Sequence, residues 1–403
     1  MTVSNKLDSC QRTNPKLLSD YNSILALSYN YRTEPMVENV SHVQHYSKKL
    51  DMKISVPISA TPVCISNIGV IICGSDGFIN MYSEDLSDIK WRHRLNSRIY
   101  ATPTVLFKKK QIIVGDVDGT VVVLDYEGKR ISRIANGKCI YNNIVTNEEE
   151  TIAYFNTFER KLYCVSIDKL DVLWVANLPT PWFKTQESFA ANRDPYAAPV
   201  ITDQGTILSA NGNKISAFTK KGIRVWEIEL PAMIRATPAL CFRSKRGVAP
   251  CVNGKVVVFD YDLGKTLMIE DLQGRIVNSP GLSNMSCCVG DLSGNLLCID
   301  LNELSAKWRV NVGAGLDHGS VTSTPAGDFV FITDRGNAIC LSYEDGSFIW
   351  ESMQTIGLPN QSTKLNQSLN ITNNGKMYAS SYDGYVYSYI FEEEKYEAYP
   401  DYK

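Results

Sequence analysis

The sequence predicts an all-β fold, an eight-bladed β-propeller with four antiparallel strands in each blade. Three observations carry this prediction: a repeat of about forty residues, tryptophans at one fixed offset within the repeat, and a short Thr-Pro signature upstream of it. Propellers repeat one small sheet around an axis, so a periodic sequence is their signature.

The repeat consists of a turn flanked by two β-rich segments, as in GDVDGTVVVLDYEGKRIS and GDLSGNLLCIDLNELSAKW. The turn position holds Gly77, Gly119, Arg160, Gly212, Gly254, Gly294, Gly336 and Gly384. Their spacings are 42, 41, 52, 42, 40, 42 and 48 residues. Glycine suits a tight hairpin because such turns need a positive φ. Arg160 therefore predicts a different turn in the third copy.

Five of the six tryptophans stand fourteen residues after the turn, namely Trp91, Trp174, Trp226, Trp308 and Trp350. An aromatic ring at this offset can dock on the neighbouring blade and seal the interface. Burying ~200 Å² at roughly 25 cal/mol per Å² contributes several kcal/mol as an upper bound. We interpret these five tryptophans as packing residues.

An inner strand precedes each turn and is marked by a small-Thr-Pro signature. The eight segments are SATPV, YATPT, IYNNI, YAAPV, RATPA, VNSPG, HGSVT and NQSLN. Eight inner strands match eight turns, which predicts eight blades of four strands.

Ring closure is predicted from the segment YSKKL at residues 46–50, which resembles the outer strands WRHRL and WVANL but precedes the first blade. We expect this N-terminal strand to close the ring in the last blade, because a closed ring hides its edges. The alternative is that Glu394–Tyr399 forms that outer strand alone. Residues 1–42 are then an N-terminal extension, with one helix expected at Leu17–Tyr29, and residues 43–403 are the propeller.

The charge balance is 41 Lys and Arg against 43 Asp and Glu, a net charge of -2. Nucleic acids and anionic membrane surfaces attract proteins with a basic excess, so neither is an expected partner. We see no secretory signal and no apolar run of ~18 residues, and expect a cytoplasmic, monomeric protein. The 11 cysteines are then expected to be reduced and mostly buried. No C-x-x-C occurs, and no metal site is predicted.

These segments resemble the PQQ-like repeat family, also called quinoprotein alcohol dehydrogenase-like propellers. The family pattern A-x-D-x-x-x-G-K-x-x-W is visible in VLDYEGKRIS and FDYDLGKTLM, and the resemblance covers nearly the whole chain from residue 43 onward. It implies the propeller fold. It does not imply one function, because known members include periplasmic quinoprotein dehydrogenases, an outer-membrane assembly lipoprotein and propellers attached to adenylating enzymes.

A PQQ-dependent dehydrogenase is the least favoured of these functions, and no cofactor is expected. The dehydrogenases carry a vicinal disulfide near the cofactor, which Cys287-Cys288 would match. This pair falls in the second strand of the sixth blade, away from the channel mouth. We interpret both cysteines as core residues.

A ring of residues three places before the proline position leads into the inner strands. Its members are Ser59, Tyr100, Ile140, Tyr196, Arg235, Val277, His318 and Asn366. One place earlier stand Ile58, Ile99, Cys139, Pro195, Ile234, Ile276, Asp317 and Leu365, which are apolar except for Asp317. The alternation predicts that the first ring faces the central channel and the second grips the neighbouring blade.

The ligand-binding residues predicted at the channel mouth centre on Arg235. Helped by Arg98 or Arg275, it would hold a carboxylate or phosphate. Asn366 would add a hydrogen bond. Trp182, in the long connection after the third blade, would form an aromatic wall.

The catalytic residues predicted beside them are His318, Tyr100, Tyr196 and Asp317. His318 would move a proton near neutral pH, and the tyrosines would donate hydrogen bonds or assist the transfer. The alternative is a channel lined with polar groups and filled with ordered water.

Two functions follow. The first is a propeller that binds a small polar or anionic molecule at the channel mouth, with proton-transfer chemistry of the lyase, cyclase or isomerase type in specialised metabolism. The second is a non-catalytic scaffold for a partner protein, such as an adenylating-type enzyme. A deep pocket holding Arg235 and His318 would favour the first, and exposed apolar residues on one face the second.

Overall fold

The structure is a computed structural model that describes residues 45–53, 58, 60–135, 138–179, 196–317, 319–324, 327–351, 369–371, 377–380 and 385–392. The expected helix at Leu17–Tyr29, the alternative outer strand at Glu394–Tyr399 and the boundary between residues 42 and 43 lie outside these ranges.

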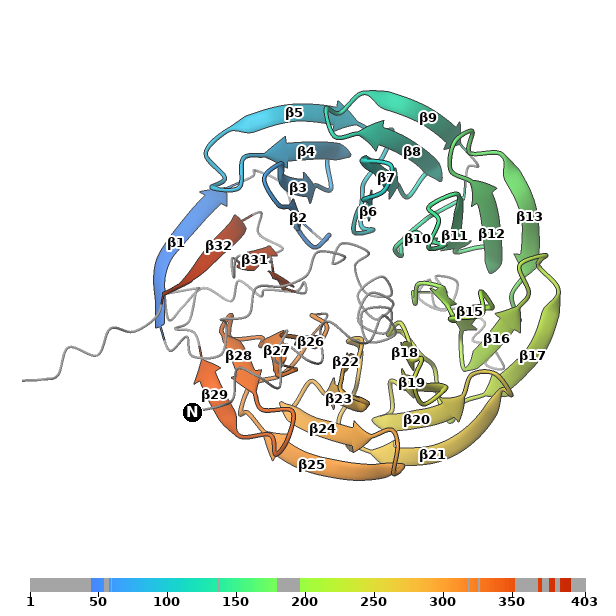
Figure 1. The fold of residues 1–403 in the computed structure, drawn as a ribbon, viewed down its shortest axis with the longest axis vertical. Coiled ribbons are helices and arrows are strands. Elements are labelled where there is room, and N and C mark those ends of the chain that lie inside the picture. The colour runs from blue at the N-terminus through green and yellow to red at the C-terminus, as the bar shows by residue number, and fades with distance from the viewer. Residues whose placement is uncertain are drawn as a thin grey trace, which may run out of the picture.

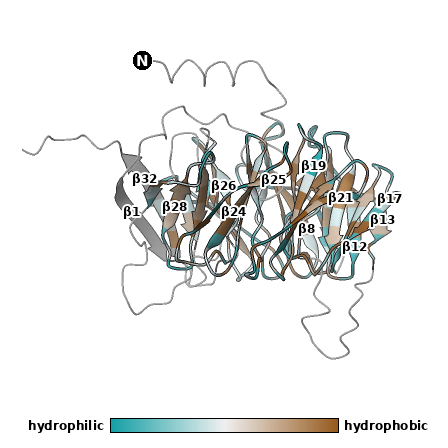
Figure 2. Cartoon of the chain, turned by 90° about the horizontal axis from the view of Figure 1, so that it is seen from below, coloured by the Kyte–Doolittle hydropathy of each residue, from teal (hydrophilic) through white to brown (hydrophobic). Residues whose placement is uncertain are grey.

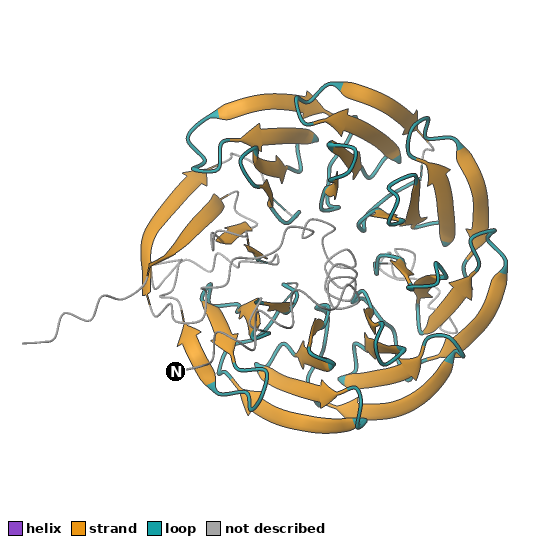
Figure 3. Ribbon diagram, viewed as in Figure 1, coloured by secondary structure: helices purple, strands orange, loops and turns teal. Residues whose placement is uncertain are grey.

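The described residues form eight four-stranded antiparallel sheets, arranged as blades around one axis (Figure 1). They are drawn throughout as strands and loops (Figure 3). The all-β propeller is therefore confirmed. Within the described ranges, the chain has no helix that could cross a membrane.

Blades one to seven each take four consecutive strands, from the axis outward. The first four blades are β2 (Val63–Ile65), β3 (Gly69–Cys73), β4 (Phe78–Tyr82), β5 (Ile89–Arg94); β6 (Thr104–Leu106), β7 (Gln111–Gly115), β8 (Thr120–Asp125), β9 (Arg130–Ala135); β10 (Val145–Thr146), β11 (Ile152–Thr157), β12 (Lys161–Ser166), β13 (Val172–Asn177); and β14 (Val200–Ile201), β15 (Ile207–Asn211), β16 (Lys214–Phe218), β17 (Arg224–Glu229).

The remaining blades complete the ring. They are β18 (Ala239–Cys241), β19 (Arg246–Pro250), β20 (Lys255–Asp260), β21 (Lys265–Asp271); β22 (Gly281–Ser283), β23 (Ser286–Gly290), β24 (Asn295–Asp300), β25 (Ser305–Asn311); β26 (Thr322–Ser323), β27 (Phe329–Ile332), β28 (Ala338–Leu341), β29 (Phe348–Glu351); and β30 (Asn370–Ile371), β31 (Met377–Ser380), β32 (Tyr385–Glu392) with β1 (His45–Lys53).

The last blade closes the ring with the N-terminal strand. β1 pairs antiparallel with β32, in a register that places Leu50 opposite Ser388, and the strand order is β1-β32-β31-β30. The closure expected from YSKKL is confirmed. The closure gives the last blade the same four strands as the others, with a short inner edge strand beside the axis and an outer edge strand on the rim.

The outer strands share a β-bulge one residue before the tryptophan position. In β13, for example, Trp174 pairs with Cys164 and Val172 with Val165, so Leu173 is the extra residue. The same irregularity recurs in β5, β9, β17, β21, β25 and β29. A bulge bends and twists an exposed edge, which hinders pairing with another strand.

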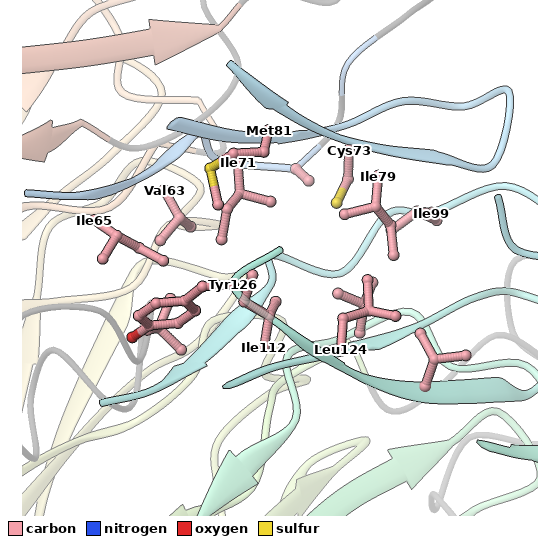
Figure 4. Packing of buried hydrophobic residues seen from close by; sticks show 14 of the residues in the cluster. Val63, Ile65, Ile71, Cys73, Ile79, Met81, Ile99, Ile112, Leu124 and Tyr126 are labelled. Carbon is pink, nitrogen blue, oxygen red and sulfur yellow. The ribbon is translucent and has the colours of Figure 1, made fainter. Parts of the chain in front are cut away.

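The core consists of apolar layers between neighbouring blades. Between blades one and two, Ile71, Ile79 and Met81 pack against Ile112 and Leu124, and all five are buried (Figure 4). Side chains of adjacent sheets interdigitate because alternate residues of each strand point to opposite faces.

The tryptophans seal these layers from outside. The Trp91 indole N–H donates a 2.7 Å hydrogen bond to the carbonyl oxygen of Tyr126 in the next blade, and the ring covers Gly128. A Cβ on Gly128 would lie 2.5 Å from Trp91 Cδ2. The same pairing joins Trp174 with Gly222, Trp226 with Gly264, and Trp308 with Gly346. The packing role is confirmed for these four tryptophans.

Blades without the tryptophan use leucine instead. In the outer strands β9 and β21, the tryptophan position holds Ser132 and Met268. These two residues pair with the third strand of their blade in the same register as the tryptophans of the other blades. The glycine position of the following blade is then Leu170 or Leu304, with φ values of 56° and 54°. The left-handed conformation strains leucine. The strain is offset because the leucine fills space that an indole occupies elsewhere.

Arg160 does not produce the different turn that we expected. Its φ is 57°, and its N–H donates to the Thr157 carbonyl oxygen at 2.9 Å, as the Gly119 N–H donates to Asp116 at 3.1 Å. The arginine adopts the left-handed conformation within the common turn. The expectation was wrong because this conformation is unfavourable, but not forbidden, for a residue with a Cβ.

The described cysteines are free thiols, and all of them except Cys139 are buried. Cys287 packs between blades five and six, and Cys288 between blades six and seven. Their side chains therefore lie on opposite faces of β23 within the core. This placement does not fit a vicinal disulfide beside a cofactor at the axis.

Alkylation should distinguish these thiols. Burial raises the pKa of Cys287 and Cys288 well above the ordinary value, and the thiolate is the reactive form. Iodoacetamide at pH 8 should modify the half-buried Cys139 in the folded protein, and Cys287 and Cys288 only after unfolding, as measured by peptide mass mapping. Modification of Cys288 as fast as Cys139 would contradict the core placement.

Candidate functional site

The candidate site lies on the face where the outer strand of one blade connects to the inner strand of the next, here called the entry face. The turns between second and third strands reach the same face. For example, Val117 N, in the β7–β8 turn, donates to Arg98 O in the β5–β6 connection at 3.0 Å. The residues just before each inner strand therefore surround the axis on this face.

A chain of hydrogen bonds between blades identifies equivalent residues. Thr61 N donates to Thr102 Oγ1, Ala198 N to Thr237 Oγ1, and Thr237 N to Ser279 Oγ, at 3.1, 3.0 and 3.0 Å. In the third blade the acceptor is Asn143 Oδ1, 2.9 Å from Thr102 N. Asn143, not Asn142, is therefore equivalent to the threonine of the Thr-Pro signature.

This equivalence corrects the predicted ring in the third blade. Ile140 is fully buried, and its N–H donates to Asp116 O at 3.3 Å. The ring position belongs to Tyr141, one residue later. The alignment failed here because IYNNI lacks the Thr-Pro marker.

The seventh blade differs from the third. Leu316 is fully buried, its N–H donates to Asp291 O at 2.9 Å, and it packs against Gly290 as Ile140 packs against Gly115. Thr322 pairs with Val330 as Gly281 pairs with Cys288, so one more residue separates Leu316 from the inner strand than in the other blades. The strand register therefore leaves the predicted alignment of this blade unchanged, and its ring residue, His318, lies outside the described residues. Asp317, beside it, is half-buried.

Three tyrosines of successive blades meet at the ring position. Tyr100 stacks on Tyr141 with ring centroids 4.9 Å apart, and Tyr196 meets Tyr141 edge-on at 5.2 Å. Phe158, from the β11–β12 turn, stacks on Tyr141 at 5.4 Å and also contacts Tyr196 at 5.4 Å. Aromatic pairs at these separations attract one another. We call Tyr100, Tyr141 and Tyr196 the tyrosine arc.

Arg235 continues the arc on the fifth blade. Its guanidinium carbon lies 4.7 Å from the Tyr196 ring centroid, within the range of a cation–π contact. Its Nε is buried and has no hydrogen-bond partner among the described residues. A buried donor without an acceptor is costly, so this N–H suits an acceptor from a ligand or from water.

The ring position of the sixth blade is Val277, which is 9% exposed. From blade two to blade six the ring therefore holds three tyrosines, an arginine and a valine. The structure brings together the predicted Tyr100, Tyr196 and Arg235 on one arc.

The other predicted residues are placed differently. Arg98 and Arg275 are exposed on the connections into blades two and six, so two blades separate Arg98 from Arg235. His318, Asn366 and Trp182 lie outside the described residues. In the described part of the chain, no group of three or more His, Cys, Asp or Glu residues could hold a metal ion.

Comparisons with known proteins agree with the fold. The family model described as outer membrane protein assembly factor BamB matches residues 117–352. A search of curated proteins found no match.

Solved structures with the same architecture come from several classes of protein. BamB from Moraxella catarrhalis has a TM-score of 0.67 and 16% identity, covering 87% of this chain and 100% of that one. Quinohemoprotein alcohol dehydrogenase from Comamonas testosteroni has a TM-score of 0.66 and 11% identity, covering 96% and 83%. Sqt1 from Saccharomyces cerevisiae has a TM-score of 0.67 and 11% identity, covering 87% and 100%. At these identities the likeness concerns the fold.

Proposed function

Since the chain belongs to the PQQ-like repeat β-propeller family described as outer membrane protein assembly factor BamB, we propose that it binds an anionic ligand around its axis. The ligand's carboxylate or phosphate is held by Arg235 on the entry face, next to the tyrosine arc. The fold supports this proposal because a propeller gathers one residue from every blade around the axis.

The observation that supports the proposal is the environment of the Arg235 side chain. Tyr196 covers the guanidinium at 4.7 Å, which holds its plane, and the buried Nε has no described acceptor. A planar guanidinium with open donors binds carboxylates and phosphates through charge-assisted hydrogen bonds. We assign no proton-transfer step to Tyr100 or Tyr196, because the contacts of their rings are packing contacts.

The test is calorimetric titration with 3-phenylpropionate and with inorganic phosphate. Arg235→Met keeps most of the apolar contact with Tyr196 but removes the donors. It should weaken binding by roughly 10- to 100-fold, because a hydrogen bond to a charged group contributes about 1.5–3 kcal/mol. Arg133→Ala, which removes an exposed arginine from β9, is the matched control. Equal affinity of Arg235→Met and wild type would reject the proposal.

A scaffold for a partner protein is the second candidate, favoured by exposed aliphatic side chains on three adjacent outer strands. Leu173 of β13, Val225 of β17 and Ile269 of β21 are 52%, 54% and 49% exposed. These strands follow one another along the rim (Figure 1), and Figure 2 shows hydrophobic residues on them. Exposed apolar patches mark surfaces that bind other proteins.

The scaffold is tested by affinity capture. The double variant Leu173→Ser, Val225→Ser should lose a partner that the wild type retains, whereas Arg235→Met should still capture it. The same captured protein in equal yield from all three would exclude these strands as the docking surface.

A further inference from the structure

We propose that the outer strands of blades one and two bind an acidic segment of a partner protein. The surface, here called the basic rim, consists of Lys90, Arg92 and Arg94 of β5 and Arg130 and Arg133 of β9. It includes neither Arg235 nor the exposed aliphatic side chains of β13, β17 and β21. The inference therefore goes beyond the proposed function.

The basic rim concentrates positive charge in a chain whose charges are otherwise balanced. β5 and β9 carry these five cations and no Asp or Glu, whereas the whole chain has a net charge of -2. All five side chains are exposed, and none of them forms an ion pair with another described residue. Cations of blades four and five are paired instead. Arg224 of β17 meets Glu227 at 2.7 Å, and Lys255 of β20 meets Asp271 of β21 at 2.6 Å. The charge of the basic rim is therefore open to an outside partner.

Two arginines of the basic rim are held in place by β4. Arg92 pairs across the sheet with Asn80, and Arg94 pairs with Phe78. Their guanidinium carbons lie 4.2 and 5.3 Å from the centroid of the Phe78 ring, within the range of cation–π contacts. Arg92 Nε also donates a hydrogen bond to Asn80 Oδ1 at 2.9 Å. Because these contacts already restrict the side chains, less conformational entropy is lost when their terminal nitrogens bind a carboxylate.

The arginines of β9 face the seam between blades one and two. Arg130 and Arg133 pair across the sheet with residues of the apolar layer between these blades. His93 of β5 pairs with Ile79 of the same layer, so its side chain points to the same seam. Burial lowers the pKa of His93, and the nearby charges of Arg130 and Arg133 lower it further. Since β5 and β9 also follow one another along the rim (Figure 1), their cations form one surface across the seam.

The partner segment that fits this surface is an extended chain in which acidic residues alternate with aliphatic ones. Carboxylates bind guanidinium groups through paired, charge-assisted hydrogen bonds. Arg92 and Arg94 stand two residues apart on one strand, roughly 7 Å, which is also the spacing of alternate residues in an extended peptide. On the same two strands, Ile89 and Ile131 are 49% and 46% exposed and offer apolar contacts. Surfaces for single-stranded nucleic acids present aromatic rings to the bases, so these aliphatic side chains favour a protein partner.

The test measures the fluorescence anisotropy of labelled probes titrated with the full chain. One ten-residue peptide alternates glutamate with valine, a second alternates glutamate with serine, and a third alternates lysine with valine. A ten-nucleotide oligothymidine is the fourth probe. We expect the glutamate–valine peptide to bind at least tenfold more tightly than each of the other probes at about 50 mM salt. Its affinity should fall at least threefold at about 300 mM salt, because salt screens exposed charges.

The variants locate the binding surface. Four changes together, Arg92→Gln, Arg94→Gln, Arg130→Gln and Arg133→Gln, should weaken binding of the glutamate–valine peptide at least tenfold, since each exposed ion pair contributes only a small part. The matched control removes four exposed cations from blades four and five through Lys220→Gln, Lys221→Gln, Arg243→Gln and Lys265→Gln. This control and Arg235→Met should bind the peptide like the wild type. The unfolding midpoint of each variant reports its folding.

Three results would overturn the inference. If the glutamate–valine peptide does not bind the wild type, or if both fourfold variants bind it equally, the basic rim is not a docking surface. Oligothymidine that binds as tightly as this peptide would make the partner a nucleic acid. Equal affinity for the glutamate–serine peptide would exclude the aliphatic contact with Ile89 and Ile131. The anion site at Arg235 is measured by other ligands and is unaffected by any of these results.

Discussion

Alanine at Gly222 should lower the free energy of unfolding by roughly 2–5 kcal/mol. The added Cβ would lie 2.7 Å from Trp174 Cδ2 and 2.8 Å from Cε3, so the indole must leave its place on the next blade. The φ of Gly222 is +77°, which strains any residue with a side chain. Urea unfolding, followed by the change in midpoint, measures the loss.

Gly313 provides the control for the strain that a side chain causes in a left-handed backbone. Its φ is +72°, close to that of Gly222, but nothing lies within 4 Å of its added Cβ. Gly313→Ala should therefore cost only the strain, about 1–2 kcal/mol. The difference between the two variants isolates the tryptophan contact, and equal losses would show that the contact contributes nothing.

A double variant tests whether the two kinds of blade interface are interchangeable. Blades two and three join through Ser132 and Leu170 where blades three and four use Trp174 and Gly222. Trp174→Ser combined with Gly222→Leu should be more stable than the sum of the single changes by at least about 1 kcal/mol, because each residue suits only its own partner. Additive losses would mean that leucine does not replace the indole.

The fold could be predicted from the sequence because the same packing problem recurs in every blade. Tryptophans at one offset mark a contact that recurs between neighbouring blades. The resemblance of YSKKL to later outer strands assigns β1 to the last blade. Leu170 and Leu304 could not be predicted in the same way. The turn is left-handed in every one of these blades, but leucine stands there where the preceding blade lacks the tryptophan, which is a relation between two repeats and not a property of either one.

The site was only partly predictable, for a different reason. Arg235 and Tyr100 follow from the Thr-Pro marker, which fixes the alignment of their blades. Tyr141 was missed because its blade lacks that marker, and a shift of one residue moves every side chain to the other face. The dipeptide Ile-Tyr, present as Ile99-Tyr100 and again as Ile140-Tyr141, was the signal that could have corrected the alignment.

Phe158 had no such signal. It stands in a turn whose equivalent residues in other blades include Val117 and Leu292, so only the folded arrangement of the third blade shows that it stacks on Tyr141. The asymmetry of the ring arises in this way. A repetitive scaffold supplies equivalent positions, and the residues that depart from the repeat give one arc of the entry face its chemistry.

Replacing Asp116 with alanine should be as damaging as Gly222→Ala, and should lower the free energy of unfolding by about 3–5 kcal/mol. The Asp116 carboxylate is completely buried and accepts four backbone hydrogen bonds. Two come from Asn96 and Ser97, in the connection that leaves the first blade, at 3.2 and 3.1 Å. The others come from Asp118 and Thr120, in its own turn, at 3.0 and 2.7 Å.

The size of this loss follows from what happens to the donors. Asp116→Ala leaves N–H groups of two blades without an acceptor in a place closed to most water, and each unpaired buried donor costs about 1–3 kcal/mol. Asp125 is the matched control, because its carboxylate accepts N–H groups of Glu127 and Lys129 in an exposed turn, where water can replace it. Asp125→Ala should therefore cost about 1 kcal/mol.

Asp116→Asn separates charge from shape at the same position. The amide keeps the volume but turns an N–H₂ group toward backbone donors, so it should recover only a minor part of the loss. Urea unfolding of the three variants gives the comparison. If Asp116→Ala were no worse than Asp125→Ala, the carboxylate would not be the link between the first blade's outgoing connection and the second blade's turn. The entry face, where Asp116 O also accepts the N–H of Ile140 beside Tyr141, would then be held in place by other contacts.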